Sequence, residues 1–122
     1  PTWIRACATD EIDQEDLIRF DYDGATYAIY HSLEGEFFAT AGKCTHEEVH
    51  LCDGLVMGHL IECPKHNGQF DYRTGEAKRS PACQNLKTYA VKVENGDVFI
   101  DTFLKKKNLR QITKHMKNSS YS

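Results

Sequence analysis

Two short segments that carry both cysteine and histidine constrain this chain more than any other feature. The first reads C-T-H, the second reads C-P-K-H, and sixteen residues separate them. The side chains of metal-ligand type in these segments are Cys44, His46, Cys63 and His66. Each segment offers one thiol and one imidazole, so the two segments must meet in the folded chain if they bind the same metal centre.

The order of these ligands distinguishes between kinds of metal centre. A Cys2His2 zinc site is one alternative, but zinc modules more often take a C-x-x-C pair from one element and an H-x-x-x-H pair from another. A [2Fe-2S] cluster with mixed ligands gives the order a purpose, because both cysteines then bind one iron and both histidines bind the other. Two loops of the same polarity can hold such a cluster from opposite sides.

The first segment continues as CTHEEVHLC and so contains two further residues of ligand type, His50 and Cys52. The four residues named above complete the protein ligands of such a cluster. We therefore expect His50 to be a surface or supporting residue and Cys52 to be a small buried side chain. Structural or core roles are expected as well for Cys7, Cys83, His31, His59 and Trp3.

Composition and length favour one ordinary globular domain. Hydrophobic residues make up 40% and charged residues 27% of the 122 residues, and no apolar run approaches the roughly 18 to 20 residues that a membrane span requires. The N-terminal residues lack the basic and apolar regions of a secretory signal, so we expect a cytoplasmic protein. An odd number of cysteines, five, in a reducing compartment favours metal ligation over structural disulfides.

Charge is divided unevenly along the chain. The formal net charge is -3, but residues 105–122 hold six basic residues and no acidic one. The rest of the chain holds 9 basic and 18 acidic residues, a formal charge of -9. A body this acidic disfavours nucleic-acid binding, which depends on neutralising phosphates, and it suits docking on a basic protein surface.

Short segments rich in β-branched and aromatic residues, separated by turn signals, predict an all-β domain. The expected strands cover residues 3–8, 17–22, 26–31, 37–40, 59–63, 69–72, 88–94 and 97–101. The dipeptides Asp23-Gly24 and Asn95-Gly96 predict tight hairpin turns, because both tolerate positive φ angles.

Two segments that do not fit the strand pattern, 42–58 and 64–68, carry residues of ligand type and are expected to be functional loops. The cluster-binding loops are placed at about 42–58 and 63–70. A third loop, RTGEAKRSPACQN, is expected either to pass beside the other two or to be a plain surface connection. We place the domain at residues 1–103 and a basic C-terminal tail at 104–122. The tail has a narrow apolar stripe and is expected either to form a short helix or to be a frayed, solvated end.

The pattern C-T-H followed by C-P-x-H-x-G resembles the Rieske iron-sulfur motif, with Pro64, Gly68 and Phe70 at positions where that family has equivalents. The stretch HNGQFDYRTGEA is similar to the small Rieske-type ferredoxins of ring-hydroxylating and related multicomponent oxygenases, including rhizopine-type and anthranilate-type systems. The resemblance spans residues 3–100. It implies an antiparallel β-sandwich with a cluster-binding subdomain of two loops, a covering loop at Pro81, and one [2Fe-2S] cluster on Cys44, His46, Cys63 and His66.

Departures from the respiratory Rieske pattern bear on the redox potential. Respiratory members have an additional cysteine in each cluster loop, where this chain has Val49 and Lys65, so no disulfide can join the loops. Those proteins also have a serine and a tyrosine where this chain has Gly68 and Phe70. Missing hydroxyl donors leave the charge of the reduced cluster less stabilised, which predicts a potential at the low end of the Rieske range, about -150 mV.

The resemblance implies a one-electron carrier rather than an enzyme. Its expected donor is a NAD(P)H-dependent flavoprotein reductase, its acceptor is a terminal oxygenase, and the imidazole edges of His46 and His66 are the expected exit for the electron. A monomer is expected. The alternatives are a Rieske subunit of another reductase, such as the small subunit of a nitrite reductase, a zinc-binding interaction module, and a redox or iron sensor.

Overall fold

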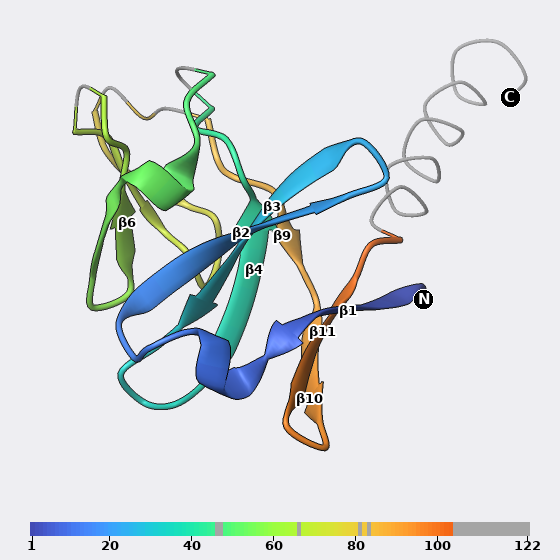
Figure 1. Ribbon diagram of the computed structural model, residues 1–122. Coiled ribbons are helices and arrows are strands. Elements are labelled where there is room, and N and C mark those ends of the chain that lie inside the picture. The colour runs from blue at the N-terminus through green and yellow to red at the C-terminus, as the bar shows by residue number, and fades with distance from the viewer. Residues whose placement is uncertain (46–47, 66, 81, 83, 104–122) are drawn as a thin grey trace, which may run out of the picture.

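The computed structural model describes residues 1–45, 48–65, 67–80, 82 and 84–103, which form three antiparallel sheets (Figure 1). The first has the order β1 (Trp3–Ala8), β11 (Asp97–Asp101), β10 (Val91–Glu94). The central sheet has the order β2 (Asp16–Tyr22), β3 (Ala25–His31), β4 (Phe37–Ala41), β9 (Thr88–Tyr89). The third has the order β5 (Leu55–Met57), β6 (Leu60–Glu62), β7 (Gln69–Asp71), β8 (Ala77–Arg79). Two single turns of 3-10 helix, η1 (Thr9–Glu11) and η2 (Leu51–Asp53), complete the described elements. The all-β prediction is confirmed, and within the described ranges no helix has the length and apolarity to cross a membrane.

Both expected hairpin turns are present. Asp23 and Gly24 have φ angles of 50° and 78°, and Asn95 and Gly96 have φ angles of 52° and 79°. These positive values belong to the two-residue turns whose twist matches that of antiparallel strands. The turns fix the registers of β2 with β3 and of β10 with β11.

Strand β3 is buried on both faces because the central sheet lies between two hydrophobic clusters. Side chains alternate along a strand, so successive residues point to opposite faces of the sheet. Tyr27 and Ile29 belong to the cluster shared with the first sheet, whereas Ala28 and Tyr30 belong to the cluster shared with the third sheet. One strand therefore supplies the core of both halves of the molecule.

The cluster between the central and third sheets contains the residues of functional interest. Its buried members are Leu17, Ala28, Tyr30, Cys44, Leu51, Val56, Ile61, Cys63, Phe70, Tyr72, Ala82 and Leu86. The cluster between the first and central sheets contains Cys7, Ile12, Tyr27, Ile29, Ala39, Val98 and Ile100. Burial of Cys7, which is 2% exposed, confirms the prediction for that residue.

The segment 88–94 departs from the sequence prediction of one continuous strand. Thr88 and Tyr89 pair with β4 in the central sheet, whereas the residues from Val91 onward pair with β11 in the first sheet. The chain thus crosses from one sheet to another at Ala90. The unbroken β-pattern gives no sign of this crossing, because residues on both sides of it are equally suited to strands.

The segments predicted as loops also contain regular structure. Residues 42–58 include η2 and β5, and the third loop includes β8. Each of these strands has three residues, which is too short for a periodic pattern to be recognised. Their pairing partners, β6 and β7, are what define them as strands.

Side chains from the segments before β2, between β3 and β4, and after β7 contact the turn between β5 and β6 and its neighbour His59. The Gly58 N–H donates to Glu15 Oε2 at 2.9 Å, and the Tyr72 hydroxyl donates to the Gly58 carbonyl at 2.8 Å. His59 Nε2 lies 2.6 Å from Glu34 Oε1, a contact that holds the pKa of Glu34 below its usual value. These contacts orient the third sheet, and with it the second ligand segment.

Other predicted structural residues can now be placed. His31 Nδ1 lies 2.7 Å from the Ile12 carbonyl oxygen, and its ring stacks on Phe37, so both His31 and His59 have the structural roles expected. Trp3 differs from its prediction. It is half-buried, outside both clusters, with the Lys92 ammonium 4.7 Å from its ring centroid.

Candidate metal centre

The first ligand segment forms a loop that closes on itself. The backbone N–H of Cys44 donates to the carbonyl of Val49 at 3.0 Å, and an isolated antiparallel bridge joins Lys43 to His50. The Leu51 N–H then donates to the Gly42 carbonyl at 2.8 Å. Cys44 is thereby fixed at the base of the loop, directly after β4.

The second ligand segment closes in the same manner. The backbone N–H of Cys63 donates to the Gly68 carbonyl at 2.7 Å, which again lies five residues further along the chain. Asn67, just before this carbonyl, has a φ angle of 59°, in the region that asparagine tolerates better than most residues. Each cysteine thus stands at the base of a short closed loop, and each loop includes one predicted histidine ligand in its sequence.

The two cysteines lie in one hydrophobic cluster although nineteen positions separate them in sequence. Cys44 is 6% exposed and Cys63 is 1% exposed. Both belong to the cluster between the central and third sheets, together with Leu51 and Phe70. The fold therefore gathers the predicted thiol ligands into a common environment from which water is largely excluded.

The third loop contacts both ligand loops. The Thr45 hydroxyl donates to the Gln84 carbonyl at 2.8 Å, which ties the third loop to the first. A Cβ atom placed on Gly68 would lie 3.1 Å from both the Cβ and the backbone N of Ala82, so the third loop also lies directly against the second. Of the two interpretations of this loop, the covering role is the one that these contacts support. No local pattern in the sequence predicts the hydrogen bond from Thr45.

The four positions at which this chain differs from respiratory Rieske proteins lie in or beside the two ligand loops. Val49 accepts the hydrogen bond from Cys44 and packs against the same hydrophobic cluster, whereas Lys65 is exposed. Phe70 is fully buried, and Gly68 is buried against Ala82. Buried positions without hydroxyl groups thus adjoin the base of the second ligand loop.

Cys52 lies in η2, which directly follows His50 and contacts β2. His50 is half-buried, and within the described part of the chain its buried Nδ1 atom has no hydrogen-bond partner. Cys52 is half-buried rather than fully buried as expected, because η2 packs against β2 with one side towards solvent. Burial, followed by the charge of Asp53, raises the pKa of the Cys52 thiol.

Thiol groups elsewhere are kept protonated by their surroundings. Burial, reinforced by Glu11, raises the pKa of Cys7 to about 11.

Some predictions concern residues outside the described ones. These are the predictions for His46, His66, Pro81, Cys83 and the tail 104–122. The structure thus brings together the two predicted cysteine ligands, and the assignment of the histidine ligands stays a prediction.

Comparison with known proteins identifies the fold. The family description "Rieske [2Fe-2S] domain" matches residues 2–90. The chain belongs to this family. The match includes all four predicted ligands and the three loops described above. It also includes both sheets that border the hydrophobic cluster containing Cys44 and Cys63. The family resemblance predicted from the sequence is therefore confirmed.

Several individual Rieske proteins are similar to this chain over most of its length. The ferredoxin component of the naphthalene 1,2-dioxygenase system of Pseudomonas putida is 44% identical over 99 residues, covering 81% of this chain and 94% of the relative. The ferredoxin of Sphingomonas yanoikuyae B1 is 37% identical, with a TM-score of 0.77 over 81% of this chain and 97% of that chain. A chain from the complex of reduced oxygenase and oxidised ferredoxin of carbazole 1,9a-dioxygenase is 33% identical, with a TM-score of 0.76 over 80% and 91%. Solved chains described as nitrite reductase small subunits are 16% and 18% identical, which is evidence for a shared fold alone.

Proposed function

We propose that this Rieske domain is a low-potential ferredoxin of a multicomponent oxygenase system. It carries single electrons from a NAD(P)H-dependent flavoprotein reductase to a terminal oxygenase, and it acts as a carrier without catalysing the oxygenation. A cytoplasmic location and a monomeric state are parts of this proposal. The observation that carries it is the pair of closed loops that bury Cys44 and Cys63 in one cluster, in a chain similar over most of its length to dioxygenase ferredoxin components.

Four residues are assigned as ligands of one [2Fe-2S] cluster: Cys44, His46, Cys63 and His66. The described part of the site fits this group, because Rieske clusters need two thiolates close together and the fold buries two thiols in a common apolar environment. When bound, such a cluster would take up and release one electron at a time. The chain's own contribution is to orient the cysteines, through the hydrogen bonds that close each loop, and to exclude water.

The low potential is proposed from the residue types at positions 68 and 70, in and beside the second ligand loop. Hydrogen-bond donors near cluster sulfurs stabilise the reduced state and raise the potential. Here the buried neighbours are Phe70, which has no hydroxyl, and Gly68, which has no side chain. A potential near the lower limit of the Rieske range suits a carrier that is reduced by NAD(P)H through a flavin.

The partner surface is assigned to the end of the molecule formed by the ligand loops. Glu48, Asp53 and Leu55 are exposed within the first ligand-bearing segment, 42–58, and Leu55 is 56% exposed. An exposed apolar side chain bordered by carboxylates fits a partner with an apolar patch inside a basic rim. His46 and His66, by their place in these loops, are proposed as the exit for the electron.

The direct test is electron paramagnetic resonance of the dithionite-reduced protein, together with counts of iron and acid-labile sulfide. We expect two irons and two sulfides per chain, and a rhombic signal whose average g value is the low one typical of mixed cysteine and histidine ligation. A colourless protein containing one zinc per chain would contradict the proposal.

The ligand assignment is tested by matched cysteine and histidine variants. Cys44→Ser and His46→Ala should abolish the visible absorption of the cluster, whereas Cys52→Ser and His50→Ala in the same loop should retain it. Retention of a normal spectrum by Cys44→Ser, or its loss in Cys52→Ser, would overturn the assignment.

The carrier role is tested by electron transfer. The purified protein, supplied with NADH and catalytic amounts of a ferredoxin reductase, should accept one electron per chain and pass it to a terminal oxygenase in a single turnover. Isolation as a permanent complex with a large reductase subunit would instead support the nitrite reductase alternative.

A further inference from the structure

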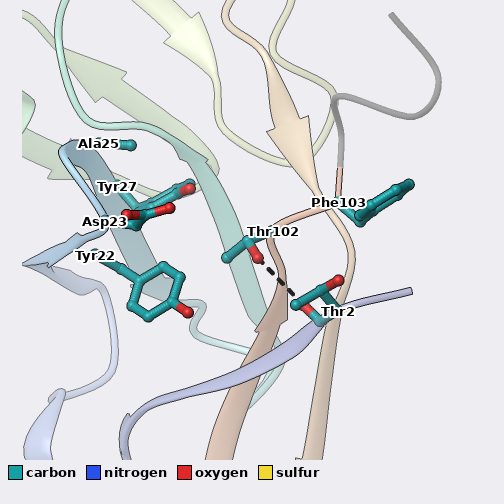
Figure 2. A pocket seen from close by; sticks show the side chains of 7 residues that line it. All are labelled: Thr2, Tyr22, Asp23, Ala25, Tyr27, Thr102 and Phe103. Atoms are coloured by element: carbon teal, nitrogen blue, oxygen red, sulfur yellow. Dashed lines mark hydrogen bonds between the residues drawn. The ribbon is translucent and has the colours of Figure 1, made fainter. Parts of the chain in front are cut away.

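A hollow of about 220 Å³ lies between the β2–β3 turn and the ends of β1 and β11. Figure 2 shows Tyr22, Asp23 and Tyr27 along one side and Thr2, Thr102 and Phe103 along the other. None of these residues belongs to the ligand loops. Nothing in the proposed electron-carrier function uses this hollow.

The chemistry of its walls favours a cation with an apolar stem. Tyr22 is 39% exposed and offers an aromatic ring and a hydroxyl group, while Tyr27 is buried at 6% exposure. Burial, and then the charge of Asp23, raises the pKa of Tyr27, and both residues line the hollow. Aromatic rings beside a carboxylate attract an ammonium group through both charge and the ring quadrupole.

The exit of the C-terminal tail is fixed at the edge of this hollow. Asp101 Oδ1 accepts hydrogen bonds from the backbone N–H of Thr2 and from that of Phe103, both at 2.9 Å. The Thr102 N–H also donates to the Thr2 carbonyl at 2.9 Å. The last described residue, Phe103, therefore lines the hollow from which the following residues must continue.

We propose that this hollow binds the basic start of the chain's own tail, with a lysine ammonium of residues 105–107 against Asp23 and the ring of Tyr22. Three consecutive lysines begin two residues after Phe103. Two to four residues span at most about 7 to 14 Å, so the length of the chain allows these lysines to reach the hollow. A tethered group has an effective concentration on the order of millimolar, well above that of a free competitor.

Charge complementarity supports this occupant. Residues 104–122 carry six basic and no acidic side chains, while the rest of the chain has a formal charge of -9. Because the inference rests on the hollow and the charge distribution, it is independent of the proposed electron-carrier function. A basic segment of another protein is the main competing occupant, and the experiment distinguishes the two.

The experiment is limited trypsin digestion of the full-length protein with its cluster, followed by intact-mass spectrometry. Cleavage after residues 105–107 should be slow in the original chain at low salt. In Asp23→Asn it should be about fivefold faster, the factor expected when an exposed ion pair with a cation–π contribution is lost. Asparagine tolerates the positive φ angle of position 23, so this variant removes the charge and keeps the turn.

Two further variants complete the test. Tyr22→Ala should accelerate cleavage in the same way, while Asp13→Asn, an exposed carboxylate beyond the other end of β2, should leave the rate unchanged. Equal cleavage rates for the original chain and Asp23→Asn would overturn the proposal. It would also be overturned if Asp13→Asn accelerated cleavage as much as Asp23→Asn, or if Asp23→Asn weakened binding of a partner protein without changing cleavage.

Discussion

At the scale of single residues, Asp71 has the strongest set of polar contacts in the described chain near the second ligand loop. Its Oδ1 accepts hydrogen bonds from the backbone N–H and the Nε of Arg73, and its Oδ2 accepts one from Nη2 of the same residue. The Arg73 side chain, assisted by the Arg73 backbone N–H and opposed by burial, lowers the pKa of Asp71. The stabilisation is therefore present above the ordinary aspartate pKa and is lost as pH falls through the lowered value.

Asp71→Asn should cost about 1–3 kcal/mol in the free energy of unfolding at neutral pH, because three charge-assisted hydrogen bonds are weakened or lost. The difference from the original chain should shrink as the pH is lowered towards about 3. Urea unfolding followed by circular dichroism at both pH values measures this. Glu76→Gln, which breaks an exposed pair with Lys78, is the matched control and should cost under about 1 kcal/mol. A pH-independent cost for Asp71→Asn would show that the charge is not the cause.

Phe70 and Gly68 are the residues on which the proposed low potential is argued. Phe70→Tyr combined with Gly68→Ser restores both hydroxyl groups and should raise the midpoint potential, measured by redox titration of the visible spectrum. Any side chain at position 68 presses on Ala82, so Gly68→Ala with Phe70 unchanged is the control for crowding. A potential that rises equally in this control would assign the effect to displacement of the third loop.

At the scale of elements, a hydrogen bond from the Thr45 hydroxyl to the Gln84 carbonyl joins the described parts of the first and third loops. Thr45→Val keeps the shape of the side chain and removes the donor, which leaves a loop carbonyl without its partner. We expect faster loss of the cluster to an iron chelator, measured by the decay of visible absorption, with little change in urea unfolding. Thr102→Val makes the same chemical change in the first sheet and should leave the decay rate unaltered. Equal decay rates for all three proteins would mean that the third loop does not retain the cluster.

At the scale of the whole molecule, the acidic body predicts electrostatic steering towards a basic partner. The rate of reduction by the flavoprotein reductase should fall at least about tenfold between roughly 10 mM and 0.5 M salt. The double variant Glu48→Gln, Asp53→Asn should have a shallower salt dependence, measured by stopped-flow absorption. The control, Asp13→Asn with Glu36→Gln, changes the net charge equally. Glu36 precedes β4 whereas Cys44 follows it, so these changes lie away from the ligand loops. Equal slopes for the two double variants would place the docking surface elsewhere.

Local chemistry was sufficient for several predictions. The turns at Asp23-Gly24 and Asn95-Gly96 follow from the φ angles that these dipeptides tolerate, and strands 3–8 and 97–101 have the bounds expected from their residues. The pattern C-T-H followed by C-P-x-H-x-G indicated the Rieske family, which the family comparison confirms. Each of these features depends on residues that are close together in the sequence. The sequence alone therefore contains the information needed to predict it.

Other features depend on contacts between distant segments. The break at Ala90 arises because Tyr89 pairs with β4 while Val91 pairs with β11, and the strands β5 and β8 exist only through their partners in the third sheet. The half-burial of Trp3 likewise reflects its place outside both clusters. Residue type alone could not distinguish these outcomes.

The sequence by itself determined that this protein is an all-β Rieske domain whose two segments, C-T-H and C-P-K-H, each offer one thiol and one imidazole. Only the tertiary structure decided that Cys44 and Cys63 share one buried cluster, that each closes its own loop, and that the third loop lies against both. The physical reason is that ligand spacing is a local property of the chain. Burial and loop contact depend on how the central and third sheets pack around residues far apart in sequence.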